Sequence, residues 1–375
     1  MIIGIPKESL AGETRVAILP AEIKKLSSDL LKFKIESGAG NGSFIADENY
    51  AGSGAEIVSD VYSGADLIIR INPPTEEELS KLNNGTCLIS LLAPFTNHAL
   101  IKRLAEKNIS SYCLELIPRS TYAQSMDVLS SQATVGGYRA VLNAASHLSK
   151  FFPMLMTPAG TIKPSTVLVI GAGVAGLQAI ATAKRLGAKV EAFDVRPAAR
   201  EQVESLGAKF LYMDLDYSAE TGSGYAVEMN EEFIRKEMEL LHDAAKRVDA
   251  IITTALIFGK KAPILIKEYM VNDMQPGTCI IDMAAENGGN CELTKPGEII
   301  RHKGVTIDGR LNLPAQVPYH ASQMLSKNIS KLLTEIIDDG KIKFDLENDI
   351  IKGCLVTHEK KIIHEMTKNI IEGNT

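Results

Sequence analysis

The sequence lacks tryptophan and is poor in aromatic residues, which make up 5% of its 375 positions. Proteins that bind single-stranded nucleic acid stack the bases on aromatic side chains, so this scarcity argues against such a surface. An excess of positive charge is also lacking, because 40 Lys and Arg face 46 Asp and Glu for a net charge of −6. Binding to a phosphate backbone needs a basic surface, and nucleic acid is therefore not expected as a partner.

Long hydrophobic runs and a disulfide pattern are missing as well. No segment approaches the roughly 20 apolar residues of a membrane-spanning helix, and Met1–Lys7 lacks the form of a secretory signal. A cytoplasmic protein without a direct membrane span is therefore expected. The five cysteines form no C-x-x-C pair, which favours buried thiols in a reducing compartment. The histidines show no metal-ligand spacing, and no metal site is expected.

Short apolar runs alternate with amphipathic helical patterns along almost the whole chain. This order of strand, helix and strand is typical of βαβ units in mainly parallel sheets, and it predicts the α/β class. Two series of strands indicate two domains. The first series comprises Ile2–Ile5, Phe33–Glu36, Leu67–Ile71, Cys87–Leu92 and Ser111–Leu116. The second comprises Val167–Ile170, Lys189–Phe193, Lys209–Leu211, Ala250–Thr253, Cys279–Asp282 and Val305–Asp308.

Two long helical patterns indicate how the domains are joined. One covers 127–152, which is too long for a simple crossover, and it is predicted to bridge the domains. The other covers 316–338 and leads into a tail whose last part also has a helical pattern. A return helix of this length predicts a discontinuous first domain, with residues 1–128 and 314–375 in one domain and 129–313 in the other.

The strongest local motif begins at the strand Val167–Ile170 and continues as G-x-G-x-x-G. Gly171 permits a tight turn, Gly173 lets the backbone approach a pyrophosphate, and Gly176 lets the following helix pack against the strand. The N-terminus of that helix offers unpaired N–H groups and the positive end of a dipole to the phosphates. A purely structural glycine turn is the alternative, but the strand before the motif and the helix after it favour a Rossmann-like dinucleotide site.

The choice of dinucleotide depends on Asp194, at the end of the next strand. Its carboxylate can accept hydrogen bonds from the adenosine ribose hydroxyls and would repel a 2′-phosphate, so NAD(H) is favoured over NADP(H). Arg196 lies two residues further on and can compensate the charge of Asp194. This proximity keeps NADP(H) open as the alternative.

Several segments resemble one family. Residues 171–176, followed by Ala192–Pro197, resemble the NAD(H)-binding component of proton-translocating nicotinamide nucleotide transhydrogenase. The run Gln124–Gln132, with Arg119 shortly before it, is the most specific match to this family. Shorter matches lie at 224–226, 253–257 and 286–291, and the similarity extends from residue 1 to about residue 333.

The resemblance implies a reaction and a set of partners. In this family hydride passes from NADH on this component to NADP⁺ on a partner component, Re/Si-specifically and coupled to proton passage through a membrane component. The resemblance implies a homodimer in which each chain has two Rossmann-like domains with parallel sheets, joined by long bridging helices. Its partners would be the NADP(H)-binding and proton-channel subunits, at the inner face of the cytoplasmic membrane. A non-catalytic NADH-sensing module is one alternative.

Alanine dehydrogenase is the other alternative, because Gly4–Glu8 and Arg15–Ala17 resemble both proteins. An amino-acid dehydrogenase needs a cation for the substrate carboxylate and a general acid or base, most often His. Alanine dehydrogenases carry Lys after the third strand and His after the fourth, where this chain has Asn72 and Leu91. His98 is offset from that place and is interpreted as an ordinary residue at a helix start. The resemblance therefore favours the transhydrogenase component.

Hydride transfer between two nicotinamides needs positioning rather than a protein acid or base, with the two C4 atoms about 3–3.5 Å apart. By resemblance, Gln124 pairs with the carboxamide of the nicotinamide, and Arg119 and Asp127 contact the same end of the cofactor. These three are the expected catalytic residues, and Ser130 would bind the carboxamide. For Asp127 and Ser130 the alternative is a capping role at a helix N-terminus.

The resemblance also assigns the remaining cofactor contacts. The segment 214–229 corresponds to a loop that closes over the cofactor, with Tyr225 as its tyrosine, and an ordinary surface loop is the alternative. Two positions depart from the family, with Tyr122 in place of Arg and Phe258 in place of Pro. The expected cofactor-binding residues are Arg119, Gln124, Asp127, Ser130, Gly171, Ala172, Gly173, Val174, Ala175, Asp194, Val195, Arg196, Tyr225, Thr254, Ala255 and Leu256.

Overall fold

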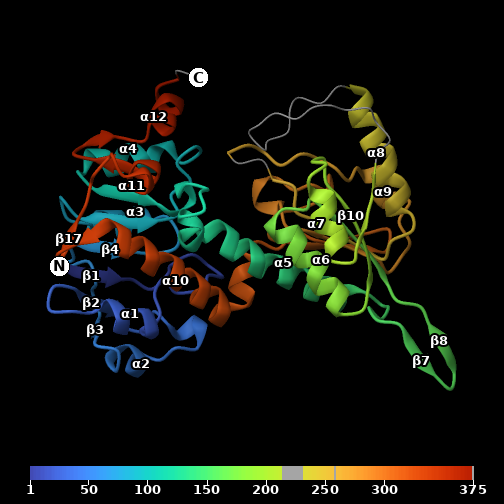
Figure 1. Cartoon of the computed structure of the whole chain (residues 1–375), viewed down its shortest axis with the longest axis horizontal. Coiled ribbons are helices and arrows are strands. Elements are labelled where there is room, and N and C mark those ends of the chain that lie inside the picture. The colour runs from blue at the N-terminus through green and yellow to red at the C-terminus, as the bar shows by residue number, and fades with distance from the viewer. Residues whose placement is uncertain (213–230, 257–258, 374–375) are drawn as a thin grey trace. The chain divides into compact units, whose positions relative to one another are not determined.

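The structure is a computed structural model, and it describes residues 1–212, 231–256 and 259–373. The chain divides into two compact units, one formed by residues 1–132 with 314–375 and the other by residues 133–313. Each unit is built on one mainly parallel sheet with helices around it (Figure 1). The predicted α/β class is therefore confirmed.

The sheet of the first unit has eight strands in the order β19-β18-β6-β5-β4-β1-β2-β3. The strands β1 to β6 pair in parallel, and the tail strands β18 and β19 are antiparallel. Their bounds are Ile2–Ile5 (β1), Lys32–Glu36 (β2), Glu56–Val58 (β3), Leu67–Ile69 (β4), Cys87–Ser90 (β5), Ser110–Cys113 (β6), Leu355–His358 (β18) and Lys361–Ile362 (β19).

The strands β3, β18 and β19 are not predicted from the sequence. β3 and β19 form the two edges of the sheet, and β18 joins the tail to the distant strand β6. β18 pairs with β6, where the hydroxyl oxygens of Ser111 and Thr357 lie 2.7 Å apart. The tail therefore covers an edge of the sheet that would otherwise expose unpaired backbone groups.

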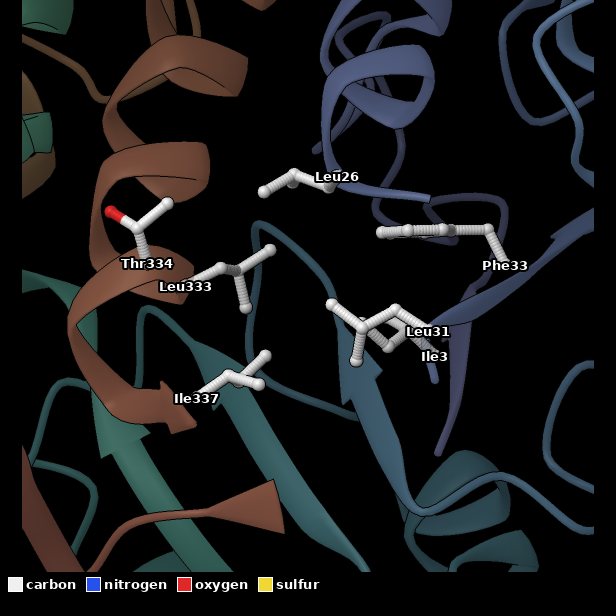
Figure 2. Close-up of a pocket in the computed structure, with 7 residues that line it drawn as sticks. All are labelled: Ile3, Leu26, Leu31, Phe33, Leu333, Thr334 and Ile337. Atoms are coloured by element: carbon white, nitrogen blue, oxygen red, sulfur yellow. The ribbon is translucent and has the colours of Figure 1, made fainter. Parts of the chain in front are cut away.

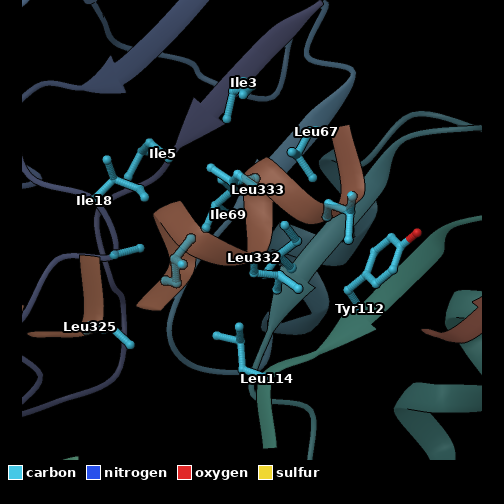
Figure 3. Close-up of a cluster of buried hydrophobic side chains, with 14 of the residues drawn as sticks. Ile3, Ile5, Ile18, Leu67, Ile69, Tyr112, Leu114, Leu325, Leu332 and Leu333 are labelled. Atoms are coloured by element: carbon cyan, nitrogen blue, oxygen red, sulfur yellow. The ribbon is translucent and has the colours of Figure 1, made fainter. Parts of the chain in front are cut away.

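Both faces of this sheet are buried, because successive side chains of a strand point to opposite sides. In β4, Leu67 and Ile69 join a cluster with Leu332 of helix α10 (Figure 3). Ile68 joins a second cluster with Leu104 of α4. Burial on both faces is typical of parallel sheets. The helices of this unit are Pro20–Leu26 (α1), Asp47–Ala51 (α2), Glu76–Lys81 (α3), His98–Glu106 (α4), Pro318–Ile336 (α10), Asp349–Cys354 (α11) and Glu365–Glu372 (α12).

The sheet of the second unit has seven strands in the order β11-β10-β9-β12-β13-β15-β14, parallel except for β14. The strand order reverses at β9, and ligands of such sheets bind at the carboxyl end of the strands beside this point. The elements are Thr166–Ile170 (β9), Lys189–Phe193 (β10), Lys209–Phe210 (β11), Ala250–Thr253 (β12), Cys279–Asp282 (β13), Ile299–His302 (β14), Val305–Asp308 (β15), Val174–Arg185 (α6), Ala199–Ser205 (α7), Glu231–Ala245 (α8) and Glu268–Asn272 (α9).

The predicted bridging helix over 127–152 is shorter in the structure. Helix α5 covers Val128–His147, so it begins in the first unit and continues into the second. The chain then forms the hairpin of β7 (Leu155–Thr157) and β8 (Gly160–Ile162), which projects from the rest of its unit (Figure 1). Pro153 lies just before the hairpin, and proline cannot continue a helix.

The C-terminal helix α12 gives a prediction about pH. The Nδ1 atom of His364 accepts a hydrogen bond from the backbone N–H of Thr367 and so caps this helix. Burial lowers the pKa of His364 below its ordinary value, and the nearby Glu365 offsets this only in part. The unfolded segment then binds more protons than the folded one, so α12 loses stability as the pH falls below about 6.5.

We expect hydrogen exchange of residues 365–372, corrected for intrinsic rates, to accelerate between pH 7 and pH 5. The matched control is His364→Asn, because Asn caps helices without titrating in this range. The variant should keep its protection across the same pH interval. Equal loss of protection in both proteins would contradict a role for this histidine.

Candidate functional site

The loop between β9 and α6 is shaped by its glycines. Gly171 has a φ of +94°, a conformation that glycine adopts without strain. A Cβ atom on Gly176 would lie 1.8 Å from the carbonyl oxygen of Gly171, so only glycine lets α6 pack this closely on the loop. A Cβ on Gly173 would meet no atom within 4 Å, so the space beside it is open. This arrangement can admit a phosphate group to the backbone.

Helix α6 presents its N-terminus to the same space. Gly173 is its N-cap, and no side chain caps the first turn. The first N–H groups and the positive end of the helix dipole are therefore available to an anion. Val174 is half-exposed and Ala172 is buried, while Ala175 is backed by α5, where a Cβ on Gly137 would lie 2.2 Å from the Ala175 carbonyl oxygen.

Asp194 follows β10 and reaches the glycine loop. Its Oδ2 accepts a hydrogen bond from the Ala172 N–H at 2.7 Å, and its Oδ1 accepts from the N–H and Nε of Arg196 at 2.8 and 2.9 Å. Burial raises the pKa of Asp194, but the bonds from Arg196 outweigh it and hold the pKa below its ordinary value. The carboxylate is thus ionised and paired. The Arg196 side chain is half-exposed and can move aside for a ligand.

A second segment lies against the glycine loop after β12. The Thr254 hydroxyl donates to the carbonyl oxygen of Gly171 at 3.0 Å. Ala255 exchanges two hydrogen bonds with the side-chain amide of Asn290, at 3.1 and 2.9 Å. Leu256 is exposed, and Val195 is half-buried beside the core. Thr254 and Asp194 therefore both contact the glycine loop.

Asp282 and Asn290 were not among the expected site residues. Asp282 is buried at the end of β13 and accepts hydrogen bonds from Thr253 Oγ1, Asn290 N and Thr294 Oγ1 at 2.9, 2.8 and 2.6 Å. It therefore holds Asn290 where this residue can fix Ala255. The sequence does contain a signal for this pair: Asp282 is an acidic residue at the end of an apolar strand, and the Gly288-Gly289-Asn290 run follows it.

The Gln124 segment belongs to the first unit. It forms a short 3₁₀ helix, Ala123–Met126 (η3), in which Ala123 and Met126 are buried whereas Gln124 is exposed. Asp127 accepts from the backbone N–H of Ser130 at 2.9 Å and from its hydroxyl at 2.6 Å. This is the capping geometry expected for the start of α5. Arg119 is exposed a few residues earlier.

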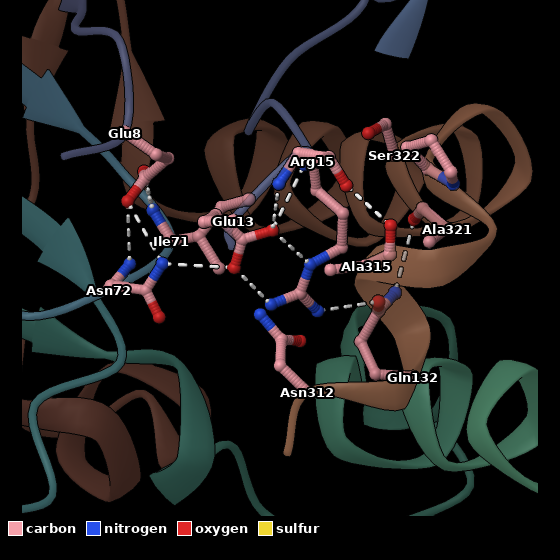
Figure 4. A network of polar contacts seen from close by, with 12 residues as sticks. Glu8, Glu13, Arg15, Ile71, Asn72, Gln132, Asn312, Ala315, Ala321 and Ser322 are labelled. Carbon is pink, nitrogen blue, oxygen red and sulfur yellow. Dashed lines mark hydrogen bonds and ion pairs between the residues drawn. The ribbon is translucent and has the colours of Figure 1, made fainter. Parts of the chain in front are cut away.

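The first unit also contains a buried polar network around Arg15 (Figure 4). Glu13 binds Arg15 through two hydrogen bonds, at 2.6 Å to the terminal guanidinium nitrogen and 2.8 Å to Nε, and Gln132 accepts a third at 2.9 Å. The side-chain amide nitrogen of Asn72 donates to Glu8 and Glu13 at 3.1 and 3.0 Å. Burial raises the pKa of Glu13, but the bonds from Arg15 dominate and lower it to about 2.

A second buried guanidinium lies beside this network. Arg70 is 1% exposed, forms an ion pair with Glu78 at 2.6 Å and lies 3.7 Å from Glu8. Its Nε donates to the carbonyl oxygen of Asn72 at 2.7 Å. Burial raises the pKa of Glu8, with Arg70 acting in the opposite direction. Both arginines therefore lie within ion-pair distance of carboxylates of the chain itself, but the two terminal nitrogens of Arg70 make no hydrogen bond among the described residues.

Leu91 and His98, the two positions compared with the histidine of alanine dehydrogenase, make local contacts with the backbone. Leu91 is a half-buried apolar residue whose N–H donates to the Ile71 carbonyl oxygen at 2.9 Å. His98 is the first residue of α4, as interpreted from the sequence, and its Nε2 lies 2.9 Å from the Phe95 carbonyl oxygen. Tyr225 and Phe258 lie outside the described residues.

Other candidate sites are weaker. An apolar cavity of about 240 Å³ in the first unit is lined by Ile3, Leu26, Leu31, Phe33, Leu333, Thr334 and Ile337 (Figure 2). Its one hydroxyl, on Thr334, already donates to the Lys331 carbonyl oxygen. Among the described residues there is no cluster of three His, Cys, Asp or Glu side chains that could hold a metal ion. In the same part of the chain, no helix is both long and apolar enough to cross a membrane.

Comparison with known families matches both halves of the chain. Residues 4–136 match the alanine dehydrogenase/PNT N-terminal domain, and residues 140–365 match the alanine dehydrogenase/PNT C-terminal domain. The chain belongs to the alanine dehydrogenase/PNT family. The resemblance to the transhydrogenase branch and to alanine dehydrogenase is thereby confirmed at the level of the family.

Relatives in this family include members of both branches. A protein of Rhodospirillum rubrum, named as the first part of the alpha subunit of NAD(P) transhydrogenase, is 46% identical, over 97% of this chain and 98% of its own length. A solved structure of transhydrogenase from Sinorhizobium meliloti is 39% identical, with a TM-score of 0.88 over 97% of this chain and 100% of its own. Alanine dehydrogenase of Methanococcus maripaludis is 28% identical, over 97% of this chain and 95% of its own length.

The second and third glycines of the G-x-G-x-x-G motif, Gly173 and Gly176, allow a matched test. Gly176→Ala forces a Cβ against a backbone oxygen, and we expect it to destabilise the protein by about 1–3 kcal/mol in thermal unfolding. Gly173→Ala places its methyl in open space with a φ of −78°, so the melting temperature should not change. The same methyl should weaken NADH binding at least about tenfold if a pyrophosphate approaches this backbone. Unchanged NADH affinity in a folded Gly173→Ala protein would contradict the placement of the phosphates.

Proposed function

We propose that this chain is the NAD(H)-binding subunit of a proton-translocating NAD(P)⁺ transhydrogenase, which passes hydride from NADH to NADP⁺ on a partner subunit. The observation that carries the proposal is the position of Asn72, whose amide is bound to Glu8 and Glu13 where alanine dehydrogenase would need a cation. The relatives named as transhydrogenase subunits support the same choice.

An amino-acid dehydrogenase must bind a substrate carboxylate and move a proton at the reacting carbon. Arg15 is held by Glu13, which stays ionised down to a pH of about 2 because its pKa is that low. Arg70 is held by Glu78 and Glu8, and the amide nitrogen of Asn72 is bound to two carboxylates. A substrate carboxylate would have to displace these buried internal partners, which is costly.

The residues of the second unit fit the phosphate and adenosine parts of NAD(H). Bound NAD(H) supplies the nicotinamide ring that gives or takes the hydride. Gly171–Ala175 and the N-terminus of α6 bind the pyrophosphate. Asp194 accepts from the adenosine ribose once Arg196 moves aside, and Val195 and Arg196 line the same end. Thr254–Leu256 contact the cofactor from the segment that follows β12. NADP(H) binds to the partner subunit.

The residues of the Gln124 segment act on the nicotinamide end. Gln124 can pair with the carboxamide as both donor and acceptor, which fixes the orientation of the ring. Arg119 and Asp127 contact the same end, and Ser130 binds the carboxamide while Asp127 holds its hydroxyl. Tyr225 would close over the cofactor, as the family resemblance implies. No residue in this set needs to titrate, because transfer between two nicotinamides moves only a hydride.

We further propose a homodimer that binds NADP(H)-binding and proton-channel subunits at the inner face of the cytoplasmic membrane. The hairpin β7–β8 supports the homodimer, because Met156 and Ile162 are 76% and 43% exposed on it. An isolated two-stranded hairpin is only marginally stable in water, so a second copy of the chain would cover and stabilise it.

The function is tested by following reduction of an acetylpyridine analogue of NAD⁺ by NADH, with and without a family NADP(H)-binding component loaded with nucleotide. Rapid reduction is expected only when that component is present, because the second nicotinamide lies on it. Alanine with NAD⁺ in a parallel reaction should give no NADH above background.

Two outcomes would replace the proposal with an alternative. Oxidation of alanine by NAD⁺ would make the chain an alanine dehydrogenase and would mean that Arg15 is available to substrate. Tight NADH binding and association with the partner, without any hydride transfer, would identify a sensing module.

A further inference from the structure

Gln124 is exposed, so its position depends on the backbone that carries it. Within η3, Ala123 and Met126 are buried in the same hydrophobic cluster as Leu325 and Ile329 of α10. Apolar contacts of this kind hold a segment against a helix but do not define its position along that helix, because they are not directional. Directional contacts are therefore needed to define where Gln124 lies.

Two side chains of α10 make such contacts, one on each side of Gln124. Asn328 donates from Nδ2 to the carbonyl oxygen of Ser125 at 2.8 Å. Glu335, two turns further along the helix, accepts from the Tyr122 hydroxyl at 2.6 Å. The residues before and after Gln124 are thereby both tied to one helix.

We propose that Asn328 and Glu335 are positioning residues, which fix the Gln124 segment on α10 for hydride transfer without touching the cofactor themselves. This inference rests on the proposed function and extends it to residues outside the cofactor site. Near-attack geometry tolerates little displacement, and a shift of about 1 Å can cost about 100-fold in rate. A loop that carries an exposed orienting amide therefore needs anchors of this kind.

Asn328 is costly in its position. It is 8% exposed, and its Oδ1 has no hydrogen-bond partner among the described residues. A buried polar atom without a partner costs about 1–3 kcal/mol, so the side chain is not optimal for stability alone. What it provides is the single bond to Ser125, next to Gln124.

Glu335 is itself held in place. Its second oxygen, Oε1, accepts from Asn348 Nδ2 at 2.6 Å, and Asn348 Oδ1 caps helix α11 through the N–H groups of Ile350 and Ile351. The hydrogen bonds from Tyr122 and then from Asn348 lower the pKa of Glu335. The carboxylate therefore remains an ionised acceptor at neutral pH, and the Tyr122 anchor extends through it to a second helix.

The test compares Asn328→Leu, which refills the volume but removes the donor, with Ser326→Ala as a matched control. Ser326 lies on the same helix, is buried, and makes one hydrogen bond to a backbone N–H, that of Leu19. If Asn328→Leu does not fold, Asn328→Ala replaces it, because the shorter side chain also lacks the donor. Both variants are measured in the full chain with a nucleotide-loaded NADP(H)-binding component.

We expect Asn328→Leu to lower the single-turnover rate of hydride transfer by about tenfold or more, with the NADH dissociation constant changed by less than about twofold. Ser326→Ala should leave both values within about twofold of the wild type. Hydrogen exchange of residues 119–127 in the chain alone should accelerate in Asn328→Leu and not in Ser326→Ala. Equal rates or equal losses in the two variants would overturn the inference.

The Glu335 anchor is tested by a double-mutant cycle. Tyr122→Phe and Glu335→Gln both weaken the same hydrogen bond, so their effects on the rate should be non-additive. Tyr122→Phe and Asn328→Leu act on different contacts. Additive effects of Tyr122→Phe and Glu335→Gln would contradict a shared anchor. If the wild type transfers no hydride, the proposed function fails, and the exchange data still decide whether α10 fixes the segment.

Discussion

The buried ion pair between Glu13 and Arg15 organises the polar centre of the first unit, where Gln132 and Asn72 also bind. A buried guanidinium is the natural binding group for a small organic acid, and the same group becomes inaccessible when the chain supplies its own carboxylate. Asn72 strengthens this arrangement by bridging Glu8 and Glu13. Asn72 stands where the resemblance to alanine dehydrogenase would place a lysine, so this position supplies an amide bound to two carboxylates instead of a cation.

Polar residues outside the expected cofactor contacts hold the loops that carry the candidate site residues. In the second unit, Asp282 fixes Asn290, and Asn290 fixes the backbone of Ala255. In the first unit, Asn328 and Glu335 play the corresponding part for the Gln124 segment. The candidate site residues are thus placed by contacts within the chain, which is the usual basis of preorganisation.

Much of the fold could be predicted from periodicity. The buried strands β9 and β12 are continuous apolar runs with clear ends. The structure has β12 and β10 at the predicted residues, and β9 begins one residue earlier than predicted, at Thr166. The strands β3, β18 and β19 could not be predicted, because β3 and β19 are short edge strands and β18 pairs with β6, which is far away in the sequence. The end of α5 was placed too late, since its pattern runs on into the segment before Pro153.

The site could be predicted only in part. The glycine motif is local, so the roles of Gly171 and Gly176 in the turn and in packing follow from the sequence itself. Glu8, Glu13 and Arg15 are close together in the sequence, but Asn72 and Gln132 lie far away, and only the fold brings them to this network. The contacts from α10 to the Gln124 segment are of the same long-range kind. The roles assigned to Gln124, Arg119 and Tyr225 stay predictions.

The central claim is that hydride moves directly between two nicotinamides and never through a titrating side chain or an organic substrate. The most direct measurement supplies NADH carrying deuterium at both C4 positions to the chain together with a nucleotide-loaded NADP(H)-binding component, and follows the label by mass spectrometry. We predict one deuterium in each NADPH formed and none in water. Label lost to solvent, or deuterium found in alanine when pyruvate and ammonium are present, would contradict the account.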